Sequence, residues 1–157
     1  MDISFKIDNK KFNYRVSAII IRDNHILFAR NKGDNYYYLP GGRVSIGETA
    51  ETAVIRELQE ELGIETNVAR PLWFTQSFYH QDRIGVDFHE IGLYFLMDDT
   101  NINLLPTDST FHSDEKDTFY FEWLAIDRLD QYVVYPQFLQ DNVNPLPSSL
   151  TMMYEDK

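Results

Sequence analysis

Short runs of apolar residues, separated by polar turn residues, predict a chain built mainly of β-strands. Tyr14 to Arg22 is rich in β-branched residues, and its apolar positions fall on both faces, as in a central strand buried on both sides. The Asp23-Asn24 pair supplies a turn, so the next run should return as a second strand. The further predicted strands are His25 to Arg30, Tyr36 to Leu39, Val68 to Tyr79, Gly85 to Met97 and Phe119 to Ile126.

One long helix is predicted from Thr49 to Leu62, because this segment is periodic, lacks Gly and Pro, and is followed by Gly63 as a C-terminal stop. Two short helices are expected later, one capped by Asp127 and one over Pro136 to Asn142. Asp98 to Asp117 is polar and predicts a long loop, a kind of segment that often carries function. The last residues of the chain show no interpretable pattern.

The long helix carries acidic residues on its apolar side. With an advance of about 100° per residue, Glu57 and Glu61 fall inside the apolar stripe, and Glu60 lies at its edge. Two carboxylates four residues apart repel each other, and burying them without partners costs more. Mg²⁺ would reverse both penalties, because it takes carboxylate oxygens as ligands. On spacing alone, a solvated acidic face remains an equal alternative.

The segment before this helix offers two weaker signals. Gly41-Gly42 lies between a predicted strand and the helix, where a backbone without side chains can approach a ligand or metal closely. A Gly pair is also a common turn. Glu48 stands just before the helix, where negative charge suits the helix dipole, so it needs no catalytic role to be explained.

Composition narrows the class of partner. The chain has 157 residues, which predicts one domain over residues 1–157, and its net charge is −11. Such an acidic protein is poorly suited to a long nucleic acid, because that affinity rests on Lys and Arg that neutralise phosphates. The absence of cysteine, of a signal-peptide pattern and of a bilayer-length apolar run predicts a cytoplasmic protein with no membrane partner.

The residues around the long helix match a known motif. From Gly42 to Ile64 the sequence reads GRVSIGETAETAVIRELQEELGI, and it resembles the Nudix box of the Nudix hydrolases at every fixed position. The pattern is Gly, five residues, Glu, seven residues, then Arg-Glu-aliphatic-any-Glu-Glu-any-Gly-aliphatic. Its fixed positions here are Gly42, Glu48, Arg56, Glu57, Leu58, Glu60, Glu61, Gly63 and Ile64.

The resemblance implies an α/β fold, an α/β/α sandwich in which a mixed β-sheet lies between helices. It also implies hydrolysis of a nucleoside diphosphate linked to another moiety, with Mg²⁺ or Mn²⁺ as cofactor. The metal ligands implied are Glu57, Glu60, Glu61 and the carbonyl of Gly41. Arg56 would orient a glutamate by pairing with Glu48, and Glu57 is the first choice for the base that takes a proton from the attacking water.

A further carboxylate is expected from the loop before the late Trp-bearing strand, as in similar enzymes. Glu115 is the first choice for this metal ligand or alternative base, and Asp117 is the second. Glu122 and Glu90 lie within predicted strands and rank lower. A merely solvated acidic loop is the alternative.

The substrate is less well determined than the reaction. The ADP-ribose type would carry a proline where this chain has Tyr79 and His80, and no NADH-type motif is found. The candidates to stack on a base are Tyr36, Tyr37, Tyr38, Phe78 and Tyr79, since stacking tolerates any base. Core or cross-strand packing is the alternative for each of them. His80 and His89 are interpreted as surface or packing residues, not as ligands.

Other classes of function remain to be weighed against the enzyme. A nucleotide-sensing binding module would keep the fold without turnover, but such modules usually have a damaged box. A structural metal-binding domain is a third hypothesis, which metal uptake without any effect of nucleotides on melting would favour. The expected partner is a small nucleotide-like substrate, and the sequence leaves a homodimer open.

Overall fold

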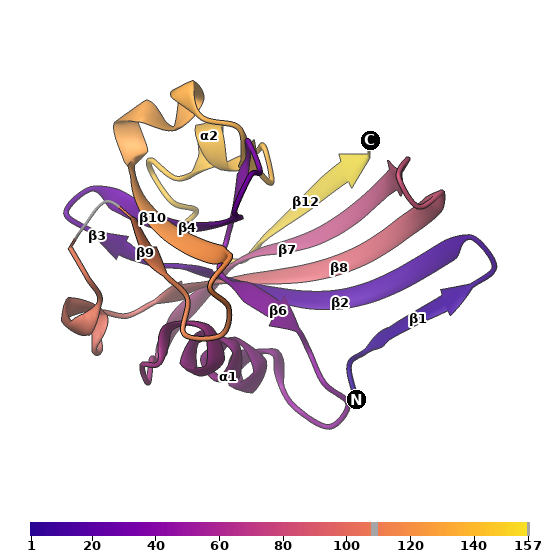
Figure 1. The fold of residues 1–157 in the computed structure, drawn as a ribbon, viewed down its shortest axis with the longest axis horizontal. Helices are drawn as coiled ribbons and strands as arrows, with labels where there is room; N and C mark the ends of the chain where they lie inside the picture. Colours follow the sequence, from indigo (N-terminus) through magenta and orange to yellow (C-terminus); the bar gives the residue numbers. More distant parts are fainter. Residues whose placement is uncertain (108–109, 157) are drawn as a thin grey trace.

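The computed structural model describes residues 1–107 and 110–156, which fold around two six-stranded mixed sheets (Figure 1). The first sheet has the order β1-β2-β8-β7-β12, with β6 paired to β2. Its strands are β1 (Ser4–Ile7), β2 (Lys10–Ile19), β6 (Gly41–Arg43), β7 (Val68–Gln81), β8 (Val86–Met97) and β12 (Thr151–Asp156).

The second sheet has the order β11-β5-β4-β10-β9, with β3 paired to β4. Its strands are β3 (Ile21–Arg22), β4 (His25–Asn31), β5 (Tyr37–Tyr38), β9 (Thr110–His112), β10 (Phe119–Ala125) and β11 (Val134–Tyr135). The helices are α1 (Ala50–Leu62) and α2 (Leu139–Asn142), with 3₁₀ turns η1 (Ile102–Leu104) and η2 (Ile126–Gln131). The α/β class is therefore confirmed, with the strands divided between two sheets.

Strand β2 contributes buried side chains to both faces of the first sheet, as its apolar positions on both sides predict. It runs parallel to β8, with Val16 opposite Leu93. Val16 and Ala18 point into a core beneath α1, whereas Ile19 belongs to a second core on the other face. Figure 1 shows α1 on one side of this sheet and α2 on the other. The sheet therefore has a packed layer on each face.

Helix α1 ends at Leu62 as the sequence predicts and begins one residue later than predicted, at Ala50. The hydroxyl of Thr49 accepts a hydrogen bond from the Thr52 backbone N–H at 3.1 Å, which caps the helix. Gly63 ends it in the left-handed region at φ 70°, which a glycine adopts without strain. Ala53 and Leu58 are fully buried against the sheet. This packing fixes which side of the helix each glutamate occupies.

Several elements differ from the sequence prediction. β1 and β12 were not predicted. The four residues of β1 alternate between polar and apolar but form too short a run to stand out, and the sequence of β12, TMMYED, does not alternate cleanly. Asp127 lies inside η2, whose N-cap is Ala125, so the predicted cap is wrong. The helix expected from Pro136 is confined to α2, because its first residues lead in from β11.

The segment predicted as a long loop is partly structured. It contains η1 and also β9, which pairs with β10. Two of its residues, 108–109, lie outside the described residues. The strand predicted from Tyr14 begins earlier, at Lys10, because β1 and β8 supply partners on both sides of it. Within residues 1–107 and 110–156, no helix is long and apolar enough to cross a membrane.

Candidate active site on helix α1

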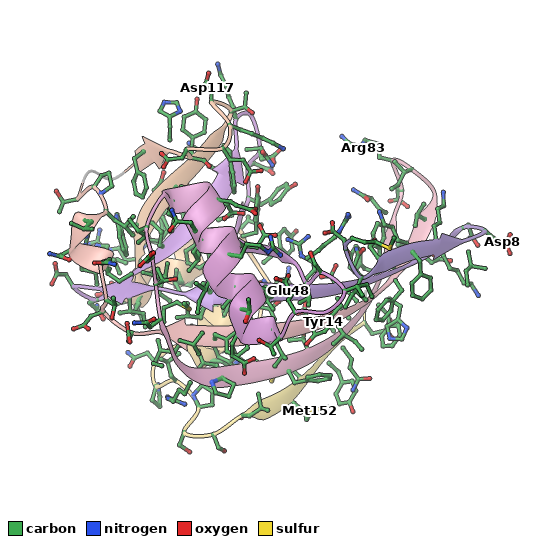
Figure 2. The ribbon with its side chains drawn as sticks, turned by 90° about the horizontal axis from the view of Figure 1, so that it is seen from below. Asp8, Tyr14, Glu48, Arg83, Asp117 and Met152 are labelled. Carbon is green, nitrogen blue, oxygen red and sulfur yellow. The ribbon has the colours of Figure 1, made fainter. Side chains whose placement is uncertain are left out.

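The three glutamates of α1 occupy different environments. Glu61 is 6% exposed, in the apolar stripe where its spacing placed it. The Glu57 side chain is 15% exposed, and that of Glu60 is 49% exposed. In Figure 2, α1 lies across one face of the sheet, with Glu48 and Tyr14 nearby, while the hairpins bearing Asp8 and Arg83 extend away from it. Two carboxylates are thus held between the helix and the sheet.

Arg56 ties the acidic residues to the segment before the helix. Its guanidinium donates to Glu48 at 2.6 Å, to Glu57 at 3.1 Å and to Glu60 at 3.3 Å. It also donates to the backbone carbonyl of Arg43 at 3.1 Å. Glu48 is itself fixed, because it accepts from the Ser45 backbone N–H at 2.8 Å. The pair of Arg56 with Glu48 expected from the resemblance is present, and it orients Glu57.

The Gly41-Gly42 pair lets the backbone approach the helix closely. A Cβ at Gly42 would overlap the carboxylate of Glu57, so that carboxylate lies directly against the Gly42 backbone. A Cβ at Gly41, where φ is 154°, would overlap the backbone carbonyl of Val16 on β2. Both glycines are therefore required by contact, one with the site and one with the sheet.

Burial makes the charged forms of these glutamates unfavourable. Desolvation is the main cause that raises the pKa of Glu61 to about 8, and the neighbouring Glu57 and Glu115 raise it further. The Gly41 backbone amide and Arg15 offset this only in part. Desolvation also raises the pKa of Glu57, against the lowering effect of Arg56. One oxygen of Glu61 is buried without a hydrogen-bond partner among the described residues. This is an uncompensated carboxylate in a largely buried site.

The donor set suits a hard divalent cation. Carboxylate and carbonyl oxygens are the ligands that Mg²⁺ prefers, and the partnerless oxygen of Glu61 has coordination capacity to spare. In the described part of the chain, no three acidic or histidine side chains converge closely enough to enclose an ion as they stand. Arg56 forms ion pairs with oxygens of both Glu57 and Glu60.

The loop before β10 is tied to the end of α1. The Asp114 backbone N–H and the Ser113 hydroxyl both donate to the Glu61 carbonyl, each at 3.0 Å. The next residue, Glu115, is exposed and raises the pKa of both Glu57 and Glu61 by its negative charge. Asp117 is not among the main causes that shift the pKa of either glutamate, and its carbonyl lies 3.0 Å from the His112 ring. The charge of Glu115 therefore acts more strongly on the helix glutamates than that of Asp117.

The strand glutamates have other partners. Glu122 accepts hydrogen bonds from the hydroxyls of Tyr37 at 2.8 Å and Thr110 at 3.1 Å. Glu90 accepts longer contacts from Asn13 and Tyr79, each at 3.4 Å. Their lower rank as ligands of the helix site agrees with this geometry.

A cleft of about 850 Å³ opens on the face of the first sheet opposite α1. Tyr38 and Tyr79, two of the predicted stacking residues, line it. Glu61 raises the pKa of Tyr38 through its charge, so the cleft reaches the neighbourhood of the helix glutamates. The volume is in the range of small-molecule sites.

Phe78 also borders this cleft, but its ring packs at 4.5 Å from that of His89. Side chains alternate along a strand, so this contact lies on the sheet face opposite to Tyr79. The ring of His80 lies 2.6 Å from Asp87. His89 is therefore engaged in packing and His80 in pairing with an acidic residue.

Arg15 and Glu90 were not chosen from the sequence as cleft residues, yet both line it. A single Arg or Glu within a strand gives no local signal. Only the β2–β8 register, which places Asn13 opposite Glu90 and Arg15 opposite Gly92, brings them together.

The comparisons with known proteins agree with this fold. The family model for the NUDIX domain matches residues 11–142. The chain therefore belongs to the Nudix family.

Two curated relatives illustrate the range of similarity. An ADP-ribose pyrophosphatase of Methanocaldococcus jannaschii is 38% identical over 86 residues, covering 53% of this chain and 48% of the relative. An 8-oxo-dGTP diphosphatase of Escherichia coli is 44% identical over 59 residues, covering 35% of this chain and 46% of the relative. The chain thus spans less than half the length of these curated relatives.

A solved structure supports the fold over more of the chain. A MutT protein from Bacillus halodurans matches with a TM-score of 0.62 at 12% identity, covering 90% of this chain and 89% of that one. At this identity the likeness concerns the fold alone.

Proposed function

We propose that this protein is a pyrophosphohydrolase that cleaves a phosphoric anhydride bond in a small nucleotide-like substrate, with Mg²⁺ or Mn²⁺ as cofactor. The observation that carries the proposal is the pair of a half-buried Glu57 and a buried Glu61, with one Glu61 oxygen left without a partner among the described residues. Nudix hydrolases generally use divalent metal ions, and the two curated relatives are named as a pyrophosphatase and a diphosphatase.

Electrostatics supports a metal at this position. Two neighbouring carboxylates whose pKa values are both raised by burial gain most from a nearby cation. We assign the ion to Glu57, Glu60, Glu61 and the carbonyl of Gly41. When bound, it would neutralise substrate phosphates and lower the pKa of a coordinated water.

The protein's own groups would then divide the remaining work. Glu57 accepts the proton of the attacking water, since it stands against the Gly42 backbone and beside a second carboxylate. Arg56, held by Glu48, keeps Glu57 in place. The nucleoside part of the substrate would lie in the cleft, with Tyr38 and Tyr79 as stacking surfaces. The ring of Phe78 packs on the other face of the sheet, so we assign it no stacking role in this cleft.

The proposal predicts metal-dependent turnover of at least one compound in a substrate panel. The panel contains nucleoside triphosphates, ADP-ribose, dinucleoside polyphosphates, NADH, CoA and nucleotide sugars, with Mg²⁺ or Mn²⁺ at mildly alkaline pH. Release of phosphate, pyrophosphate or nucleoside monophosphate is measured, and a chelator should abolish it. If nucleotides raise the melting temperature but none is hydrolysed with either metal, the protein is a binding module and the proposed activity is wrong.

Glu115 is proposed as an additional catalytic carboxylate. Glu115→Gln should lower turnover at least about tenfold, or raise the metal concentration required, since it removes a charge that acts on both Glu57 and Glu61. The melting temperature in chelator should not change, because the side chain is exposed.

Asp117→Asn is the matched control, since it removes the same charge from the same loop. It should retain wild-type kinetics. If Asp117→Asn lowers turnover and Glu115→Gln does not, the catalytic carboxylate is Asp117. If both variants have wild-type turnover and metal dependence, this loop supplies no catalytic carboxylate.

A further inference from the structure

Arg15 is a cationic side chain that lines the cleft. Among the described residues, no acidic side chain forms an ion pair with Arg15. It lies opposite Gly92 of β8, against which the Thr75 hydroxyl and the Tyr94 ring pack closely. Arg15 also acts electrostatically on Glu61 at the helix site and on Tyr79 within the cleft. It therefore stands between the reaction site and the nucleoside cleft.

Glu90 is the neighbouring acceptor on the same floor. One of its oxygens takes the two long contacts from Asn13 and Tyr79. Asn13 is itself buried and held by the Ser4 hydroxyl at 2.6 Å, so the carboxylate has a fixed support. The other oxygen of Glu90 makes no hydrogen bond to the described residues, and burial of Glu90 is incomplete. The carboxylate can therefore accept hydrogen bonds from a ligand.

The spacing of these two residues fits a phosphate followed by a ribose. Glu90 is opposite Asn13, two positions along β2 from Arg15. The rise along a strand and the spacing between strands put the Cα atoms of such diagonal neighbours about 8 Å apart. In a nucleotide, the ribose hydroxyls lie next to the α-phosphate, whereas the hydrogen-bonding edge of the base is farther away. A carboxylate with free acceptor capacity is a well-suited partner for ribose hydroxyls, as in dinucleotide-binding folds.

We propose that Arg15 binds the nucleoside-side phosphate and that Glu90 binds the 2′- and 3′-hydroxyls of the ribose, which makes this cleft selective for ribonucleotides over 2′-deoxyribonucleotides. The inference rests on the proposed function for the identity of the ligand as a nucleotide. The base would stack on the tyrosines of the cleft wall, which discriminate little between bases.

The test compares ribonucleotides with 2′-deoxyribonucleotides of the same base. Non-hydrolysable methylene-bridged nucleoside triphosphates with Mg²⁺ are titrated by calorimetry, so that binding is measured without turnover. Wild-type protein should bind the ribonucleotide roughly tenfold or more tightly, the typical effect of a hydrogen bond to a charged group. Equal binding of the two sugars, or no binding of either, overturns the inference.

Three variants separate the roles. Glu90→Gln should weaken the binding of the ribonucleotide alone and so reduce the preference for ribose to about threefold or less. Arg15→Gln should weaken the binding of ribonucleotides and 2′-deoxyribonucleotides by the same factor, because Arg15 contacts the phosphate that both share. Glu65→Gln, which makes the same charge change at an exposed position on the chain, should behave as wild type. A ribose preference that persists in Glu90→Gln assigns the selectivity elsewhere and overturns the role of Glu90.

The inference and the proposed function can fail separately. Ribose-selective binding without hydrolysis of any compound in the panel would refute the enzyme and retain the selectivity. Hydrolysis of ribonucleotides and 2′-deoxyribonucleotides at equal rates would support the enzyme and refute the selectivity.

Discussion

Replacing Glu57 or Glu61 with Gln is expected to lower the turnover number by roughly two to four orders of magnitude, the usual contribution of a positioned acid–base group or metal ligand. Gln keeps the approximate shape of each side chain and removes only its charge. The loss therefore reports on chemistry more than on packing. Steady-state kinetics at saturating metal and substrate would measure it.

The same variants should leave the metal-free protein at least as stable as the wild type. Each removes a desolvated charge and the repulsion between Glu57 and Glu61. If either Gln variant loses several kcal/mol of unfolding free energy in chelator, these glutamates are structural and the assigned site is wrong. Ala53→Asp provides the contrast, because a charge at this fully buried position should unfold the protein.

The pH dependence of this stability has a defined sign. The pKa of Glu61 is about 8 in the folded state and near the ordinary glutamate value when unfolded. The unfolded chain therefore loses its proton first, and this group makes the wild type less stable as pH rises from about 4.5 to 8. Glu61→Gln has no such titration. Its gain in unfolding free energy over the wild type, measured in chelator, should therefore be larger at pH 8 than at pH 5. Denaturant unfolding at the two pH values would measure the difference.

The sequence predicts the helix and its acidic face well, because both depend on local spacing. Periodicity and Gly63 define α1 without knowledge of the rest of the chain, although Thr49, predicted as its first residue, is its N-cap. The same periodicity places Glu61 on the buried side, and packing against the sheet then determines how deeply it is buried.

The cleft is harder to predict, because it depends on which strands are neighbours. Arg15 and Glu90 are far apart along the chain and meet only through the parallel pairing of β2 with β8. Strand β12 likewise depends on a partner, β7, that no local pattern identifies. Phe78 and Tyr79 are adjacent in sequence and face opposite sides of the sheet, so a shared stacking role could not be judged before the register was known.

The two adjacent glycines before α1 should respond to substitution in opposite ways. Gly42→Ala should lower turnover at least about a hundredfold, since its new Cβ would displace the Glu57 carboxylate that acts on the attacking water. Its stability in chelator should change little, because the displaced group is the end of a flexible side chain. Activity and thermal melting of the same preparation would show this separation.

Gly41→Ala is the contrasting variant, and its effect should be on folding. The new Cβ would overlap the Val16 carbonyl of β2, and the φ of 154° is one that side chains rarely adopt, so we expect a loss of about 1–3 kcal/mol or more. Chemical denaturation of both variants in chelator would compare them. Full activity in Gly42→Ala would mean that Glu57 acts from a position other than the one against the Gly42 backbone. A large loss of stability in Gly42→Ala would mean instead that the contact between Gly42 and Glu57 maintains the fold. Gly42 would then be a structural residue, like Gly41.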